Sequence, residues 1–314
     1  MTMSSDLFSH QKPGWLSVML IFIMAMFGFL VIGPLLGFFL ALPFTEGDLF
    51  SLQSKLASPT DYPELRLPLF IVQGCATLVG LIVGPAMYIY AIERKNPITG
   101  LFKGKPLFSK TLVLTVVVVI LFMVPNSFFI EWNAGLSLPD FLKGFEAWAR
   151  EKEDLAAQLT TFLTTFDSPT EFVVAFFVIA VLAGVGEELV FRGMLQPELQ
   201  RATGNIHVAI WLSAILFSAI HMQFFGFVPR LLLGVLFGYL YYWSGHIAVP
   251  MLAHFINNGF SVVMVYLYQL GVVDINMESM EAAPLPLVAL FTIITFGLLL
   301  HLKKFHLQHH TFAS

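Results

Sequence analysis

Charged side chains are scarce in this sequence, and their scarcity excludes an ordinary soluble domain. Asp, Glu, Lys and Arg make up 11% of the 314 residues, against about 25% in soluble proteins. The formal net charge is only -4 and no basic tract is present, so the sequence predicts no nucleic-acid partner. What is present instead is apolar, because 57% of the residues are hydrophobic and 15% are aromatic. This composition indicates a polytopic membrane protein.

Cysteine is almost missing, which excludes a disulfide framework and a thiolate metal site. The single cysteine, Cys75, lies in an apolar segment, and we expect it to be a packing residue. Also missing is a nucleophile elbow around a serine or cysteine; Ser218, next to an aromatic residue, is expected only to pack. The chemistry of this chain therefore has to come from other residue types.

Long apolar runs are abundant and predict an all-α bundle of about eight transmembrane helices, each able to cross about 30 Å of hydrocarbon. The first run is too long for a signal-peptide core, so it is expected to be a retained span. The predicted spans are 15–42, 67–92, 111–130, 170–190, 206–225, 228–243, 247–269 and 285–302. We treat residues 1–314 as one transmembrane domain with three parts. These are N-terminal spans and an outer loop (1–168), a core (169–270), and a last span with a tail (285–314).

The distribution of basic residues predicts the orientation in the cell membrane. The loop between the second and third spans is basic, as is the C-terminal tail with Lys303 and Lys304, so both termini of this multi-pass protein are expected in the cytoplasm. The loop before the fourth span is acidic and is expected outside. The basic residues of the first loop are Arg94, Lys95, Lys103, Lys105 and Lys110, and Glu278 is among the acidic residues expected outside.

Residues 139–163 of the acidic loop carry apolar side chains at helical spacing. Two interpretations stay open: an amphipathic helix on the outer membrane interface, or a solvated helix packed on the bundle. The apolar residues are Phe141, Phe145, Trp148, Leu155, Leu159 and Phe162. A second aromatic group, near the turn between the fifth and sixth spans, is expected to anchor the interface rather than gate lipid access. It consists of Phe224, Phe225 and Phe227 with Arg230.

Glycine pairs spaced four residues apart allow neighbouring helices to approach closely. Because glycine is common in membrane helices, we expect only the last of three such pairs to form a contact. The pairs are Gly33/Gly37, Gly80/Gly84 and Gly234/Gly238.

Three charged residues interrupt the fourth apolar run. A charge near the bilayer centre costs roughly 2.5–3.5 kcal/mol on insertion scales, so Glu187, Glu188 and Arg192 must be paired, solvated or used. Glu188 and Arg192 share a helix face at i,i+4 and are expected to pair. Glu187 points about 100° away and is left free. The alternative is an ion-paired helix end at the interface, without chemistry.

Two later spans add histidines and an asparagine. His221 lies in the fifth span, and His254 and Asn258 share a face of the seventh. Glu187 and His221 are each about 17 residues from the turn near Gly204, so antiparallel helices would hold them at similar height. With His254 entering from the same side, the spacing predicts a polar pocket in the cytoplasmic half of the membrane.

A glutamate beside a histidine can hold and deprotonate water, and a second histidine with an asparagine can stabilise an oxyanion. These residues therefore predict hydrolysis of an amide by activated water. Catalytic zinc is the competing mechanism, because two histidines and a glutamate are a legitimate ligand set. It is the less favoured one, since no His-Glu-x-x-His helix is present, and no cofactor is expected. The tail histidines are expected to be solvated; they are His301, His306, His309 and His310.

Three ordered motifs carry a resemblance to a known family. They read Glu187-Glu188-Leu-Val-Phe-Arg192, Phe217-Ser-Ala-Ile-His221 and His254-Phe-Ile-Asn-Asn258. Together they resemble the CPBP family of intramembrane proteases, which includes Rce1-like CAAX-processing (type II CAAX) endopeptidases and the bacteriocin-processing or immunity-associated Abi proteins. The resemblance covers about residues 170–260 and leaves the first ~165 residues outside it.

The resemblance implies an Rce1-like helical core in the C-terminal half, with a conical cavity open to the cytosol. It implies that Glu187 and His221 activate water and that His254 and Asn258 form the oxyanion hole. Glu188, Arg192 and Phe217 would then support these groups. The expected substrate is a membrane-associated protein or peptide, reached from the surrounding membrane lipid.

Two other function classes stay open. Intramembrane Glu, His and Arg also mark proton relays, as in an ion-coupled transporter; against this, the polar set is confined to one half of the chain and no inverted repeat is apparent. The other is a non-catalytic immunity or scaffold protein that kept the fold, against which the intact motifs speak.

Overall fold

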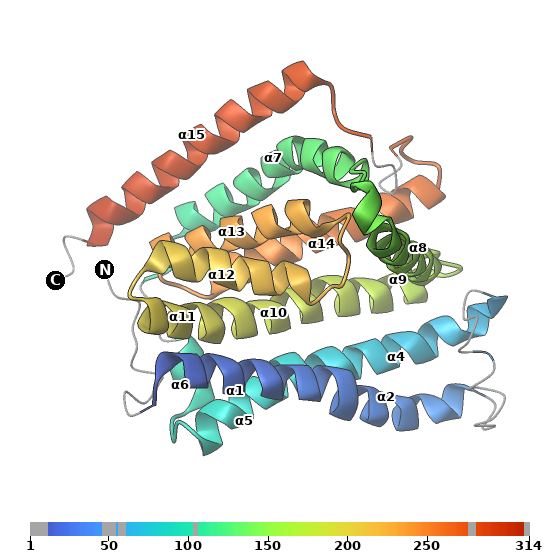
Figure 1. The fold of residues 1–314 in the computed structure, drawn as a ribbon, viewed down its shortest axis with the longest axis horizontal. Helices are drawn as coiled ribbons and strands as arrows, with labels where there is room; N and C mark the ends of the chain where they lie inside the picture. Colours follow the sequence, from blue (N-terminus) through green and yellow to red (C-terminus); the bar gives the residue numbers. More distant parts are fainter. Residues whose placement is uncertain (1–11, 46–54, 56–60, 103–105, 276–280, 311–314) are drawn as a thin grey trace.

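The computed structural model describes residues 12–45, 55, 61–102, 106–275 and 281–310, and every regular element in these ranges is helical. Most helices run along the long axis of the molecule, side by side, with the start of the first helix and the end of the last at the same end of the bundle (Figure 1). Among the sequence predictions, those on Lys103, Lys105 and Glu278 fall outside the described residues.

The all-α, multi-pass prediction is confirmed, whereas the count of spans is lower than the eight expected. Six helical segments of the described chain are long and apolar enough to cross a membrane. The fifth predicted span is the shorter apolar helix α12 (Ile206–Ala219). The sixth is α13 (Phe227–Ser244), which carries Arg230 and is not one of the six. The six are Gly14–Phe44, Pro63–Ala91, Ser109–Ala134, Pro169–Thr203, Ala248–Gln269 and Leu285–Gln308.

The first two spans form an N-terminal hairpin. The first consists of α1 (Gly14–Phe27), a π-helical segment (Gly28–Ile32) and α2 (Gly33–Ala41). The second consists of α4 (Arg66–Thr77), a π-helical segment (Leu78–Val83) and α5 (Gly84–Ala91), and α6 (Pro97–Phe102) follows it. Their backbones touch, because a Cβ added at Gly33 would lie 2.5 Å from the Ala76 Cα. Limiting close packing to the last glycine pair was therefore wrong.

The longest helical segment, Pro169–Thr203, runs through the centre of the bundle and holds the first motif. It consists of α9 (Pro169–Phe176), a π-helical segment (Phe177–Leu182), α10 (Ala183–Glu188), a second π-helical segment (Leu189–Leu195) and α11 (Gln196–Thr203). π-helical turns are rare in proteins, and those that occur are often found at functional sites. Here the second one begins directly after the two glutamates.

Three helices pack against this central segment: α12, α13 and α14 (Ala248–Gln269). The predicted contact at Gly234/Gly238 is confirmed, because a Cβ at Gly234 would lie 2.9 Å from that of Ala214 on α12. A Cβ at Gly184 would likewise lie 3.1 Å from the Phe255 backbone nitrogen, so α14 approaches the central segment closely beside His254. α7 (Ser109–Ala134) and then α15 (Leu285–His310) cover the remaining side (Figure 1).

α8 (Lys143–Thr164) is the helix expected in the acidic loop, and it combines both open interpretations. Most of its apolar stripe is exposed, with Phe141 just before it 84% accessible and Trp148 on it 43%, as in a helix at a membrane interface, although Phe162 near its end is buried. Another face packs on the bundle, where Glu146 and Ala149 are buried. Other polar residues of the helix, among them Glu151, Asp154 and Gln158, stay exposed.

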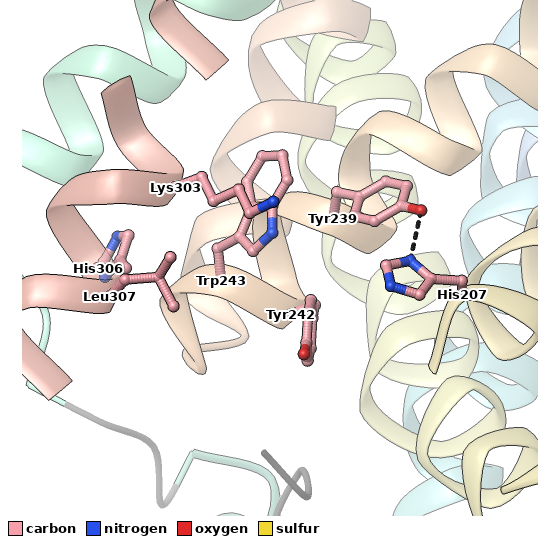
Figure 2. A pocket seen from close by; sticks show the side chains of 7 residues that line it. All are labelled: His207, Tyr239, Tyr242, Trp243, Lys303, His306 and Leu307. Carbon is pink, nitrogen blue, oxygen red and sulfur yellow. Dashed lines mark hydrogen bonds between the residues drawn. The ribbon is translucent and has the colours of Figure 1, made fainter. Parts of the chain in front are cut away.

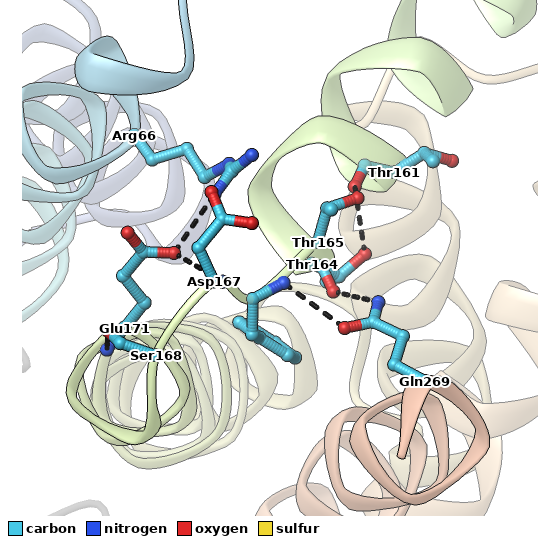
Figure 3. Close-up of polar contacts among 9 residues, drawn as sticks. Arg66, Thr161, Thr164, Thr165, Asp167, Ser168, Glu171 and Gln269 are labelled. Carbon is cyan, nitrogen blue, oxygen red and sulfur yellow. Dashed lines mark hydrogen bonds and ion pairs between the residues drawn. The ribbon is translucent and has the colours of Figure 1, made fainter. Parts of the chain in front are cut away.

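Polar contacts fix the end of α8 to three other helices (Figure 3). Arg66, at the start of α4, pairs with Asp167 at 2.5 Å and Glu171 at 3.0 Å. Gln269, at the end of α14, donates to the Thr164 carbonyl at 2.7 Å and accepts from the Phe166 N–H at 3.1 Å. α8 therefore closes the end of the bundle that lies away from both termini (Figure 1).

Candidate active site

A cavity of about 330 Å³ opens between α7, α8, the central segment, α13 and α14. It brings together all four residues predicted to be catalytic, which come from the central segment, the turn after α12, and α14. The apolar part of its wall includes Phe217, Phe225 and Phe237. Its polar wall consists of Asn126, Glu153, Glu187, His221, Arg230, His254, Asn257 and Asn258.

Glu188 lies behind this wall and accepts hydrogen bonds from two side chains at once. Its Oε1 accepts from the Arg192 guanidinium at 2.7 Å and from His254 Nδ1 at 2.8 Å. Glu188 and Arg192 are both 0% exposed. The predicted i,i+4 pair is therefore present, and the bond to His254 is an addition that the spacing did not predict.

Arg192 is enclosed by aromatic rings and a carbonyl. Its guanidinium carbon lies 4.9 Å from the Phe217 ring centroid and 5.5 Å from that of Phe237. Its Nη2 donates to the Gly234 carbonyl at 2.8 Å. Such stacking suits the planar, weakly hydrated guanidinium better than an ammonium. Phe217, expected as a supporting residue, thus packs directly on the charge that holds Glu188.

His254 is oriented by its contact with Glu188. A carboxylate can only accept, so Nδ1 carries the proton of this bond. Its ring stacks on Phe237 with centroids 5.3 Å apart, which leaves Nε2 facing Glu187 Oε2 at 3.9 Å. The two carboxylates of the first motif therefore face the His254 ring, one at each of its nitrogens.

His221 is oriented so that it presents a hydrogen-bond acceptor to the cavity. Its Nδ1 lies 2.9 Å from the Phe217 carbonyl, which can only accept, so Nδ1 carries the proton and Nε2 has its lone pair free. His221 lies two residues after Ala219, the last residue of α12, and Met222 after it adopts a positive φ of 54°. This turn leaves the imidazole in the cavity wall as a base.

Asn258 is anchored to the central segment. Its Nδ2 donates to the Ile179 carbonyl at 3.0 Å, within the π-helical segment Phe177–Leu182, and its Oδ1 accepts from Asn257 Nδ2 at 3.1 Å. The amide has two N–H groups, so one remains for a ligand in the cavity.

Four polar residues of the cavity wall were not predicted to belong to the site: Asn126, Glu153, Asn257 and Arg230. A polar side chain in an apolar run was the available signal for Asn126. Glu153 lies on α8 and gave no such signal. Treating Phe225 and Arg230 as interface anchors was wrong, because Phe225 is only 4% exposed and both line the cavity.

The cavity wall includes α8 and the turn between α12 and α13, on the side of the bundle opposite the start of α1 and the end of α15 (Figure 1). α12 ends at Ala219, so His221 lies in this turn and not within a span as expected. The location of the pocket in the cytoplasmic half of the membrane stays a prediction.

The arrangement does not gather a set of metal ligands in the described part of the chain. No group of three or more His, Cys, Asp or Glu residues there is placed to hold a metal ion. One nitrogen of His254 is occupied by Glu188, and the other faces a single carboxylate.

A second cavity, of about 150 Å³, is lined by residues of α12, α13 and α15 (Figure 2). Its wall includes Tyr239, whose hydroxyl lies 2.8 Å from His207 Nδ1, together with Trp243, Lys303 and His306. None of the predicted site residues lines it.

Comparison with known proteins identifies the segment that holds the three motifs. A family model described as type II CAAX prenyl endopeptidase Rce1-like matches residues 169–260. The uncharacterized protein YpbD of Bacillus subtilis is 32% identical over 82 residues, which are 25% of this chain and 39% of that protein. No solved structure matches.

Two relatives have names that state an activity. The membrane-embedded CAAX protease MroQ of Staphylococcus aureus is 33% identical over 93 residues, 28% of this chain and 37% of that protein. CAAX prenyl protease 2 of Arabidopsis thaliana is 32% identical over 114 residues, 30% of this chain and 37% of that protein. The chain thus spans between 37% and 39% of the length of these three relatives.

Proposed function

Because the chain belongs, through residues 169–260, to the Rce1-like type II CAAX prenyl endopeptidase (CPBP) family, we propose that it is an intramembrane endopeptidase. It hydrolyses a peptide bond in a membrane-associated protein or peptide, and residues 169–270 form its catalytic core. The observation that supports this proposal best is the single cavity lined by Glu187, His221, His254 and Asn258.

In the proposed reaction, Glu187 and His221 activate water. The Glu187 carboxylate and the free Nε2 of His221 are both acceptors on the cavity wall. A water between them donates one hydrogen bond to each, and its oxygen attacks the carbonyl carbon while Glu187 takes a proton. Glu187 then returns that proton to the nitrogen of the leaving amine. One water is consumed, and a carboxylic acid and an amine are formed.

The oxyanion of the tetrahedral intermediate is stabilised from α14. The Nε2–H of an imidazolium at His254 and the second N–H of Asn258 are the two donors. Glu188 holds the imidazolium at 2.8 Å, and Arg192 holds Glu188 at 2.7 Å. Glu188, Arg192 and Phe217 therefore position the catalytic groups without touching the substrate.

Membranes of cells that carry either the wild-type chain or Glu187→Gln would test the proposal by quantitative peptide mass spectrometry. We expect at least one membrane-associated protein to accumulate uncut in the variant. Glu131→Gln is the matched control, because it makes the same change at an exposed carboxylate of α7. Identical peptide profiles in all three strains would contradict the proposal.

A further inference from the structure

One charged group in the cavity has no part in the proposed hydrolysis. Arg230, in the first turn of α13, lines the same cavity as Glu187 and His254. Its Nη2 donates to Gln223 Oε1 at 2.6 Å, whereas its Nη1 is buried and has no hydrogen-bond partner among the described residues. It forms no salt bridge with a described carboxylate. A guanidinium carries five donors, so most of its capacity is unused.

Comparison with Arg192 shows that unused donors are not a general property of the arginines at this site. Arg192 is fully buried, but it is neutralised by Glu188 at 2.7 Å and enclosed by Phe217 and Phe237. Arg230 faces the open space of the cavity instead. A buried charge is costly unless it is paired, so an anion entering the cavity would gain most at Arg230.

Glu153, on α8, is the acidic group nearest to this position. A Cβ at Gly226 would lie 3.4 Å from both Arg230 Nη2 and Glu153 Oε1, so the two side chains share one corner of the cavity. Glu153 is engaged elsewhere, since its Oε2 accepts from the Phe225 N–H at 3.1 Å. Burial raises the pKa of Glu153, against the opposing effects of that N–H and of Arg230. Glu153 therefore lies beside Arg230 without being hydrogen-bonded to it, and the Nη1 donors of the guanidinium are left available.

We propose that Arg230 binds a carboxylate of the substrate and so sets which peptides are cut. The carboxylate is either the C-terminus of the substrate or an Asp or Glu side chain near the cleaved bond; a planar guanidinium suits both because it can donate two parallel N–H bonds. This inference rests on the proposed peptidase function. It makes Arg230 a specificity-determining residue rather than a participant in water activation.

The test uses the full chain in liposomes and a set of synthetic peptides of varied sequence. Each peptide is made with a free C-terminal carboxylate and as a C-terminal amide, and each amide that contains Asp or Glu is also made with Asn or Gln. For the form with the recognised carboxylate, Arg230→Gln should raise KM about 10–100-fold, the range for losing hydrogen bonds to a charged group. The neutral form should be cut equally by both proteins, and kcat should change little.

Two further variants keep the test decisive if Arg230→Gln folds poorly. Glu153→Gln removes the competing carboxylate and should lower KM for the carboxylate form only. Arg150→Gln is the matched control, because Arg150 lies over the Phe225 ring at 4.0 Å but is paired with Glu146 and is outside the cavity wall. Its preference between the two peptide forms should equal that of the wild type.

The outcomes separate the two proposals. If wild-type protein cuts no peptide, or Glu187→Gln cuts as well as wild type, the peptidase proposal fails and this inference fails with it. If cleavage depends on Glu187 but Arg230→Gln and Glu153→Gln keep the wild-type ratio of KM values between carboxylate and neutral forms, only the role of Arg230 is overturned. The peptide series that responds identifies the C-terminus or the side chain as the source of the carboxylate.

Discussion

The buried pair of Glu188 and Arg192 allows a quantitative prediction. Both side chains are 0% exposed, and the pair is the structural support of His254. Removing one partner of such a pair leaves an uncompensated charge, which costs about 3–5 kcal/mol. We therefore expect Arg192→Met and Glu188→Gln each to lower the free energy of unfolding by about that amount. Methionine would still fill the space between Phe217 and Phe237, so little of the loss should come from an empty cavity.

The double variant, Glu188→Gln with Arg192→Met, should lose far less free energy of unfolding than the sum of the losses in the two single variants. It removes both charges, so no buried ion is left unpaired, and we expect a coupling energy of about 2 kcal/mol or more. The assay is a double-mutant cycle on purified protein in bicelles, unfolded with SDS. The exposed pair Glu151 and Lys152, 3.6 Å apart, is the control, with an expected coupling of about 0–1 kcal/mol. If the losses at Glu188 and Arg192 add to within about 0.5 kcal/mol, the pair does not support the site.

Three more predictions concern packing, orientation and pH. Gly234→Val should lower both the free energy of unfolding and the cleavage activity, because the valine side chain would collide with Ala214 and displace the Gly234 carbonyl that accepts from Arg192. Gly297 has open space around it, so Gly297→Val is the control and should be neutral in the same assays. In a Cys75→Ser background, Gln158→Cys on α8 should react with an impermeant maleimide outside the cell and Lys304→Cys only after permeabilisation; labelling of both from one side would contradict the fold, and the reverse pattern would contradict the orientation predicted from the basic loops. The Leu138 N–H, Lys143 and Arg150 lower the pKa of Glu146 from 4.5 to about 2. The stabilisation of the fold by the ionised Glu146 is therefore present above about pH 4.5 and lost as the pH falls toward about 2. Glu146→Gln should be less stable than wild type at neutral pH, and the two stabilities should converge in acid. A difference in the free energy of unfolding that does not change with pH would refute this role.

The parts of the site that follow from local spacing were predictable. Glu188 and Arg192 pair because residues four apart share a helix face, and the structure shows that pair at 2.7 Å. Glu187, one residue earlier, is turned into the cavity for the same reason. The helical pattern of 139–163 likewise predicted a helix, which is observed as α8.

The contacts between distant segments were not predictable in this way. The bond from His254 to Glu188 depends on how α14 is rotated against the central segment, and a span pattern does not contain that rotation. The π-helical segment after Glu188 changes the rotation further. Glu153 reaches the cavity only because α8 folds back over the bundle, held by Arg66 and Gln269.

The end of the fifth span was mispredicted, because its apolar composition suggested a helix that continues past His221 to residue 225. α12 stops at Ala219 and the chain turns back into α13 at Phe227. His221 therefore lies in a turn, and apolar composition alone does not show where such a turn begins.

The role of Glu187 is tested most directly by the cleavage rate of Glu187→Gln in liposomes, with a substrate identified by the peptide mass spectrometry above. We expect kcat to fall about 10²–10⁴-fold, the usual contribution of a general base, while the free energy of unfolding and KM stay near wild-type values. Glu131→Gln should keep the wild-type kcat. A Glu187→Gln protein that is folded and cleaves at the wild-type rate would contradict the claim that this carboxylate activates the attacking water.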